Sequence, residues 1–207
     1  MEGAGSSYEP HERPMTTDPD SGTVARFKGG ALDAFDDLIN KYQDRIYGFL
    51  YRLCGNPEGA AGVTQETFLN AFKYLKGFRG ETSFRNWLYK VAASSCYRSK
   101  RKRKDEPDFQ LSIEQFFPGS DRPKFEIPDI TAMPEERLLN GELSAHIEKT
   151  ILALPKKYRI VLVLRDLEGL TTEETSTVLD ISPAAVKSRL HRARLFAKER
   201  LADYFLS

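Results

Sequence analysis

The chain has 207 residues, of which 40% are hydrophobic and 29% are charged, and its formal net charge is +1. This length and composition predict one or two small domains with compact cores. They argue against a membrane span, because the longest apolar run, residues 160–164, is far too short to cross a bilayer. No charged-then-apolar leader opens the chain, so we expect a cytoplasmic protein in which Cys54 and Cys96 are reduced packing residues.

Charge is segregated along the chain. Residues 24–104 carry a net charge of +9 and residues 143–207 a net charge of +3, whereas residues 1–23 carry −4 and residues 105–142 carry −7. Two basic segments separated by an acidic spacer indicate two nucleic-acid-facing modules on a tether. Residues 1–23 are rich in Gly, Ser and Pro and show no apolar period, so we expect a disordered extension there.

Three helices are predicted in the first basic segment. Apolar residues recur at helical spacing over residues 32–53, and the Gly-Asn-Pro triplet at 55–57 is typical of a helix end. A second helix is expected over residues 58–75, followed by a glycine-containing loop over residues 77–83. A third helix begins near Phe84 and buries one apolar face, formed by Trp87, Leu88, Val91 and Ala92.

The third helix runs into a strongly basic segment, residues 98–104, in which six of the seven residues are cationic. A helix C-terminus favours one or two cations, but six of them need a polyanion or open water. Aromatic side chains flank this segment, and aromatic rings among cations bind the unstacked bases of single-stranded nucleic acid. The alternative is that most of these rings belong to the core, which burial preference favours for Phe84 and Trp87.

The second half of the chain is predicted to be a linker and a helical domain. Residues 105–133 are acidic, contain several prolines and show few helical signals, as expected of a flexible linker. Helices over residues 135–152 and 156–167 are predicted to pack with a helix-turn-helix pair. The fold class is therefore all-α, with two small helical domains over residues 24–104 and 134–207.

The C-terminal end has the pattern of a helix-turn-helix. Thr171 and Glu174 have capping-box spacing for the first helix, and Ser182 followed by Pro183 is typical of the start of the second. Apolar residues of the second helix fall on one arc: Val186, Leu190, Ala193, Ala197 and Leu201. The opposite arc contains Lys187, Ser188, His191, Arg192 and Leu195. Such a helix suits a DNA major groove, and the alternative is an ordinary helical domain with a solvated cationic face.

Several motifs, taken in order along the chain, carry a family resemblance. They are residues 63–68 (VTQETF), 78–84 (FRGETSF), 87–92 (WLYKVA), 154–159 (LPKKYR), 164–170 (LRDLEGL) and 186–194 (VKSRLHRAR). In this order they resemble the RNA polymerase sigma factors of the extracytoplasmic-function (ECF) group, which keep only the second and fourth sigma domains.

The resemblance implies a transcription initiation factor that binds core RNA polymerase, directs it to promoters and helps to melt the DNA. The N-terminal domain would read the start-proximal promoter element and capture a base of the non-template single strand. The C-terminal domain would read the upstream element of the double-stranded promoter. Family analogy also implies an anti-sigma factor as a partner and a cytoplasmic, nucleoid-associated location. No catalytic centre, cofactor or metal site is expected.

Candidate residues follow from matching the family motifs. The candidate readers of the upstream element are Lys187, Ser188, Arg189, His191 and Arg192. The candidates for the start-proximal element are Phe78, Arg79, Ser83, Phe84, Ser94, Arg98, Lys100 and Arg101. The candidates for core polymerase are Gln65, Glu66 and Phe68. The chain departs from the family pattern at Ala61, Gly62, Ser94 and Ala184, where family members commonly carry acidic residues, asparagine and glycine.

Two other function classes fit the sequence less well. A free-standing helix-turn-helix regulator would bind an operator without polymerase, usually as a symmetric dimer. The chain shows no obvious dimerisation element, and its two unlike basic modules favour an asymmetric target. An enzyme is disfavoured, because no carboxylate or histidine cluster has metal-ligand spacing and the three histidines, His11, His146 and His191, are scattered.

Overall fold

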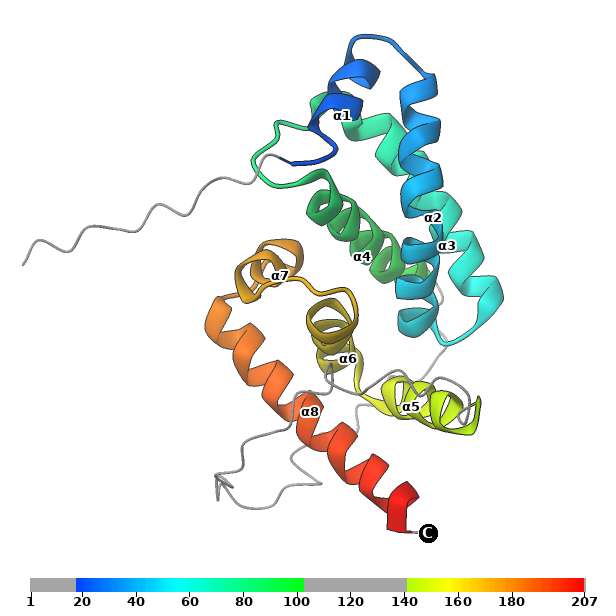
Figure 1. Ribbon diagram of the computed structural model, residues 1–207, viewed down its shortest axis with the longest axis vertical. Helices are drawn as coiled ribbons and strands as arrows, with labels where there is room; N and C mark the ends of the chain where they lie inside the picture. The colour runs from blue at the N-terminus through cyan, green and yellow to red at the C-terminus, as the bar shows by residue number, and fades with distance from the viewer. Residues whose placement is uncertain (1–17, 103–140, 207) are drawn as a thin grey trace, which may run out of the picture.

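The computed structural model describes residues 18–102 and 141–206, and the regular structure in both ranges is helical (Figure 1). The N-terminal domain consists of α1 (Ser21–Lys28), α2 (Asp33–Cys54), α3 (Pro57–Tyr74), the 3-10 turn η1 (Leu75–Gly77) and α4 (Phe84–Lys102). The C-terminal domain consists of α5 (Gly141–Ala153), α6 (Lys156–Leu162), the π-helical turn η4 (Val163–Leu167), α7 (Thr172–Leu179) and α8 (Pro183–Leu206). The predicted all-α, two-domain fold is confirmed. The predicted linker, residues 105–133, lies outside the described residues.

The N-terminal domain begins earlier than the sequence predicts. Helix α1 starts at Ser21 and buries Phe27 completely. Asp20, only 2% exposed, accepts hydrogen bonds from the side chains of Lys41 and Tyr42 in α2. Asp18 accepts a 2.7 Å hydrogen bond from the backbone N–H of Phe84 at the start of α4. The predicted disorder is therefore wrong for residues 18–23, because contacts with α2 and α4 order a segment that has no apolar period of its own.

Helix α2 provides the longest face of the N-terminal core and ends where the sequence predicts. Its apolar stripe is buried, with Ile46, Phe49 and Leu50 at 0% exposure. Gly55 then adopts a φ of +82°, a left-handed conformation that side chains rarely tolerate, and its N–H bonds the carbonyl of Tyr51. Asn56 caps α3 by accepting a 2.6 Å hydrogen bond from the N–H of Gly59. The sharp reversal brings α3 back along α2.

The helix-turn-helix has the caps that its sequence predicts. The Thr171 hydroxyl accepts a hydrogen bond from the N–H of Glu174 at 3.1 Å, and the Glu174 carboxylate accepts one from the N–H of Thr171 at 2.7 Å. Asp180 closes α7 with a φ of +53°, the left-handed conformation that Asp and Asn tolerate best among side-chain-bearing residues. Ser182 accepts a 3.2 Å hydrogen bond from the N–H of Ala185. The turn between the two helices is therefore held at both ends.

Replacing Thr171 with alanine removes half of this capping box. We expect the free energy of unfolding to fall by about 1 kcal/mol, because the N–H of Glu174 loses its acceptor. Urea denaturation followed by circular dichroism measures the change. Thr172→Ala is the matched control, since it makes the same chemical change at a hydroxyl that takes no part in the cap. Equal losses in the two variants would contradict the assignment.

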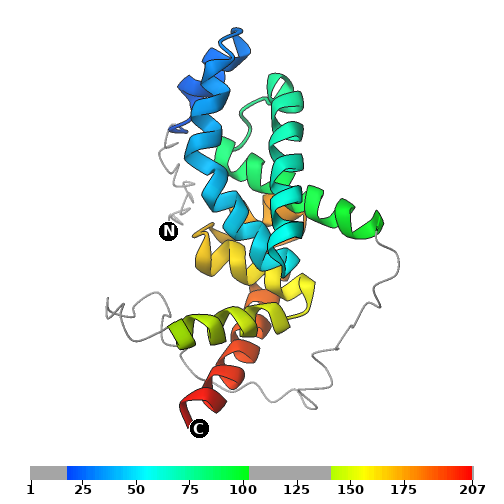
Figure 2. The same ribbon diagram turned by 90° about the vertical axis from the view of Figure 1, so that its right-hand side faces the viewer.

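The two bundles pack against each other. Helix α7 lies across α4, while α5 and α6 lie near the C-terminal end of α2 (Figures 1 and 2). Buried apolar side chains form one continuous cluster through both domains. The sequence predicts two modules on a tether, and the structure adds that they are docked. Within the two described ranges, none of the helices combines the length and apolar character that crossing a bilayer requires.

Candidate nucleic-acid interface

Helix α8 is amphipathic, as its sequence predicts, with a buried apolar face, called here the dry stripe, and an exposed polar face, called the wet stripe. The dry stripe is packed in the core, with Val186 and Ala193 at 0% exposure and Leu190 at 8%. Four of the five residues predicted on the opposite arc are exposed and form the wet stripe, namely Lys187, Ser188, His191 and Arg192, whereas the fifth, Leu195, is half-buried. Two cations, a hydroxyl and an imidazole therefore project from one exposed helix face. These are the side-chain types that bind base edges and phosphates in a major groove.

Two other arginines of α8 do not belong to this wet stripe. Arg194 makes a two-point contact with Asp166, at 2.6 and 2.9 Å, and so ties α8 to the turn η4. Arg189 is half-buried and lines a cavity of 290 Å³ together with Lys90 and Ser94 of α4. In this arrangement the predicted DNA contact Arg189 faces the N-terminal domain.

The predicted start-proximal residues divide between core and surface. The rings of Phe78 and Phe84 are buried, at 8% and 0% exposure. Ser83 caps α4 by accepting a 3.2 Å hydrogen bond from the N–H of Asn86. Exposed positions are Arg79, Ser94 and Arg98. Lys100 and Arg101 belong to α4, but their side chains lie outside the described part of the structure.

The loop between η1 and α4 faces the C-terminal domain. A cavity of 470 Å³ lies between this loop and α7. Its walls include Arg79, Trp87 and Lys90 from the N-terminal domain and Thr177 and Val178 from α7. The surface that the sequence assigns to the start-proximal element therefore lies opposite α7.

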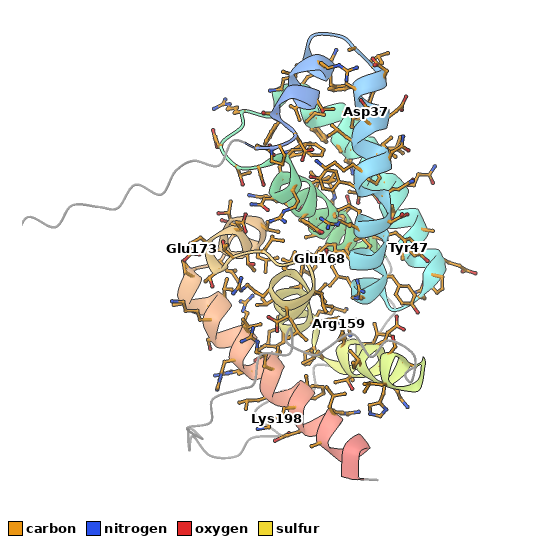
Figure 3. The ribbon with its side chains drawn as sticks, in the orientation of Figure 1. Asp37, Tyr47, Arg159, Glu168, Glu173 and Lys198 are labelled. Atoms are coloured by element: carbon orange, nitrogen blue, oxygen red, sulfur yellow. The ribbon has the colours of Figure 1, made fainter. Side chains whose placement is uncertain are left out.

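Polar contacts hold the two domains in this position. The hydroxyl of Tyr89, which is 1% exposed, donates a 2.5 Å hydrogen bond to Glu168. Glu168 also lies 3.8 Å from the Arg52 guanidinium. Figure 3 shows Glu168 and Arg159 between the two bundles, and Arg159 donates to the carbonyl of Leu53 at 3.1 Å. Burial, reinforced by the carboxylate acceptor, raises the pKa of Tyr89, so the phenol stays protonated and keeps donating.

A second polar contact joins the capping box of α7 to α4. The Asn86 amide donates a 2.9 Å hydrogen bond to Glu174, and Arg85 lies 3.6 Å from the same carboxylate. Partial burial pushes the pKa of Glu174 upward. The hydrogen bonds from Asn86 and from the backbone N–H of Thr171, together with the charge of Arg85, outweigh that effect and hold the pKa below its ordinary value of 4.5.

Because of this lowered pKa, the docked arrangement should lose stability at low pH. A carboxylate whose pKa is depressed stabilises the structure above its ordinary pKa, and the stabilisation disappears as the pH falls through the depressed value. We expect domain docking to weaken below pH 4.5. The emission of Trp87, the only tryptophan in the chain and a wall of the interdomain cavity, should then shift to the red.

Glu174→Gln is the control for this pH dependence, because it keeps the side chain's size and removes its titration. Far-UV circular dichroism in the same samples separates undocking from loss of helix. An emission change of the same size and midpoint in the glutamine variant would assign the effect to other groups.

The predicted polymerase-binding residues lie on α3 in different environments. Gln65 is exposed, Glu66 is half-buried and Phe68 is buried at 9% exposure. The exposed large apolar side chains of this helix are instead Leu69, at 65%, Phe72, at 45%, and the terminal Tyr74, at 53%. Sequence reasoning missed Leu69 and Phe72 as surface residues, although their positions relative to buried Phe68 and Ala71 follow from the helical period.

The residues at the domain interface were missed as well. Tyr89, Glu168, Asn86 and Glu174 are far apart in the chain, and no local pattern pairs them. Asn86 is 3% exposed, and its amide oxygen has no hydrogen-bond partner in the described part of the chain. A buried acceptor without a partner is uncommon in a folded protein, so this amide oxygen is free to accept a hydrogen bond from another group.

Comparisons with known proteins agree with the division into two domains. The model of Sigma-70 region 2 matches residues 38–106, and that of Sigma-70, region 4 matches residues 145–196. The RNA polymerase sigma-H factor of Pseudomonas aeruginosa is 34% identical over 87% of this chain and 92% of its own length. The ECF RNA polymerase sigma factor SigW of Bacillus subtilis is 34% identical over 87% of this chain and 95% of its own. The chain belongs to the ECF family of RNA polymerase sigma factors.

A solved structure supports the same fold for this ECF sigma factor. The sigma factor RpoE, in complex with the anti-sigma factor NepR from Bartonella quintana, aligns with a TM-score of 0.60 and 18% sequence identity. The alignment covers 81% of this chain and 96% of that chain. The ECF sigma factor is a transcription initiation factor that acts with core RNA polymerase on promoter DNA. The alternative of a free-standing regulator is not favoured, because the sigma relatives match across both domains.

Proposed function

We propose that the wet stripe of α8 reads the upstream promoter element. Lys187, Ser188, His191 and Arg192 are exposed together, while the opposite face of the same helix is packed in the core. A rigid helix with one free, hydrogen-bonding face can lie in a major groove without moving the rest of its domain. This two-faced burial of α8 is the observation that carries the proposal.

We propose that the loop before α4 and the exposed face of α4 bind the start-proximal promoter element. Arg79, Ser94 and Arg98 supply polar and cationic contacts at the surface. Phe78 and Phe84 are buried in the closed arrangement, so a captured base would need the loop to move before it could reach their rings. Asn86 already offers a buried acceptor beside that loop.

Promoter recognition then requires the two domains to separate. Helix α7 covers the loop and the adjoining face of α4, and the 470 Å³ cavity between them has α7 as one wall. Two elements held apart on one DNA duplex cannot both be reached while the domains are docked in this way. We propose that core polymerase binds the open form and that exposed Gln65, Leu69 and Phe72 of α3, together with half-buried Glu66, contribute to that contact.

An anti-sigma factor is proposed as a regulator, supported by the relative from Bartonella quintana that was solved with one. We propose that the ECF sigma factor works at the nucleoid in the cytoplasm and has no catalytic centre of its own, since bond formation belongs to the polymerase.

Start-site-specific transcription with purified core polymerase tests the proposal. A library of templates with randomised promoter elements is transcribed with and without the ECF sigma factor, and the transcripts are sequenced. We expect defined start sites only when both proteins are present. Leu69→Glu, at an exposed position of α3, should abolish them without unfolding the protein, whereas Tyr47→Glu, an exposed control on α2, should not. Selection of one DNA sequence by the sigma factor alone, unaffected by polymerase, would support the free-standing regulator instead.

A further inference from the structure

Two cysteines from different helices meet in the N-terminal domain, beside the docked C-terminal domain. Cys54 is the last residue of α2 and Cys96 lies in α4, and their sulfur atoms are 3.7 Å apart. Both are thiols in this structure. The distance is that of sulfur atoms in van der Waals contact, and a disulfide bond is about 2.05 Å long. A side-chain movement of less than about 2 Å is therefore enough to join them.

The pair has one accessible thiol and one enclosed thiol. Cys54 is half-buried, whereas Cys96 is 4% exposed. A small solute can reach Cys54 first, and Cys96 is then placed to attack it. This asymmetry is the arrangement of a reacting thiol and a resolving thiol.

The C-terminal domain supplies a cation to this pair. Arg159 of α6 donates to the carbonyl of Leu53, the neighbour of Cys54, and it lines the same small cavity as Cys96. Burial lowers the pKa of Arg159, while its attraction to Cys96 and Cys54 works in the opposite direction. A cation beside a thiol favours the thiolate, which is the form that reacts with peroxides.

We propose that Cys54 and Cys96 form a redox-active dithiol that a hydroperoxide oxidises to an intramolecular disulfide. The Cys54 thiolate attacks one peroxide oxygen, the O–O bond breaks, and the products are a sulfenic acid on Cys54 and, after protonation, an alcohol or water. The Cys96 sulfur then attacks the Cys54 sulfur, the S–O bond breaks, and hydroxide leaves with the Cys96 proton as water. The two thiols lose two electrons and two protons, and the peroxide takes up both.

The rate of this reaction depends on domain docking. The cation that favours the thiolate comes from α6, which rests on the C-terminal end of α2 only while the two domains are together. The disulfide links α2 to α4, the two helices that carry the docking contacts to Glu168 and Glu174. Oxidation therefore fixes the surface on which the C-terminal domain lies.

Hydrogen peroxide, added to the purified full-length protein, tests the proposal. Thiols are counted with a maleimide reagent, and disulfides are located by mass spectrometry of unreduced peptides. We expect both thiols to be lost together, with a peptide joining Cys54 to Cys96 and complete recovery after a dithiol reductant is added. In Cys96→Ser the reaction should stop at a sulfenic acid on Cys54, which dimedone traps. Two thiols that stay reactive, or a disulfide between two copies of the chain, would overturn the proposal.

Variants of Arg159 and Tyr89 test the link to docking. Arg159→Gln removes the cation, and we expect oxidation to slow by about tenfold, the change produced when a neighbouring charge alters the thiolate fraction by one order of magnitude. Tyr89→Phe loosens docking through another contact and should also slow the reaction, while Arg200→Gln, at an exposed position of α8, should not. Wild-type rates in both Arg159→Gln and Tyr89→Phe would overturn the role of the docked domain.

Discussion

Replacing Tyr89 with phenylalanine is expected to shift the protein from the docked toward the open form while leaving each domain folded. The substitution deletes the hydroxyl that donates to Glu168 at 2.5 Å and keeps the ring that fills the core of the N-terminal domain. The side chain of Glu168 is only 10% exposed, and its other cross-domain partner, Arg52, lies 3.8 Å away. Removing a hydrogen bond from a buried carboxylate costs about 1–3 kcal/mol of free energy. The docked form should therefore be destabilised by that amount relative to the open form.

Small-angle X-ray scattering measures this change as an increase in the radius of gyration. A shift of about 1–3 kcal/mol alters the ratio of docked to open molecules by roughly 5-fold to 150-fold. Tyr42→Phe is the matched control, because it removes the same atom from a buried phenol whose partner, Asp20, lies in the same domain. That control should lower the stability of the N-terminal domain without changing the radius of gyration. Equal expansion in the two variants would mean that the Tyr89 contact does not hold the domains together.

Replacing Arg192 with alanine is expected to reduce the discrimination between promoters. Arg192 is exposed on the wet stripe of α8, and its only contact given by the described structure is a long one, 3.4 Å to the hydroxyl of Tyr158. Folding stability should therefore change by less than about 0.5 kcal/mol. If Arg192 reads a guanine edge, binding to the preferred upstream element should weaken by about 1–3 kcal/mol relative to an element altered at that base pair.

Promoter titrations with the polymerase holoenzyme, at several salt concentrations, measure this discrimination. Arg200→Ala is the control, since it removes the same charge from the same helix, about 12 Å further along the axis. That variant should affect all promoter sequences alike. A uniform loss of affinity with Arg192→Ala, accompanied by a smaller salt dependence, would show that Arg192 contacts phosphate rather than a base.

The parts of the fold that depend on local chemistry could be predicted from the sequence. Thr171 and Glu174 form the expected capping box, Ser182 caps α8, and Gly55 ends α2. The wet stripe of α8 is exposed as its helical period predicts. Each of these features involves residues within one or two helical turns of each other, where spacing alone determines which side chains meet.

The parts that depend on distant contacts could not be predicted in this way. Helix α1 is ordered by Asp18 and Asp20, whose partners Phe84 and Tyr42 lie in other helices. The pairing of Tyr89 with Glu168 joins residues 79 positions apart. Family motifs also do not separate core from surface, and so Phe68 is a buried neighbour of the exposed Leu69.

The turn η4 sets the direction in which the second half of the C-terminal domain points. Across Val163–Leu167 the backbone is wider than an α-helix, and the N–H of Glu168 bonds the carbonyl of Val163, five residues earlier, at 2.9 Å. Deleting one residue from this turn would restore an ordinary helical pitch and rotate everything after it by about 100°. Glu168 would then point away from the phenol it now meets. The one extra residue in this turn therefore sets the rotation of the following segment about the helix axis, and this rotation brings Glu168 to Tyr89.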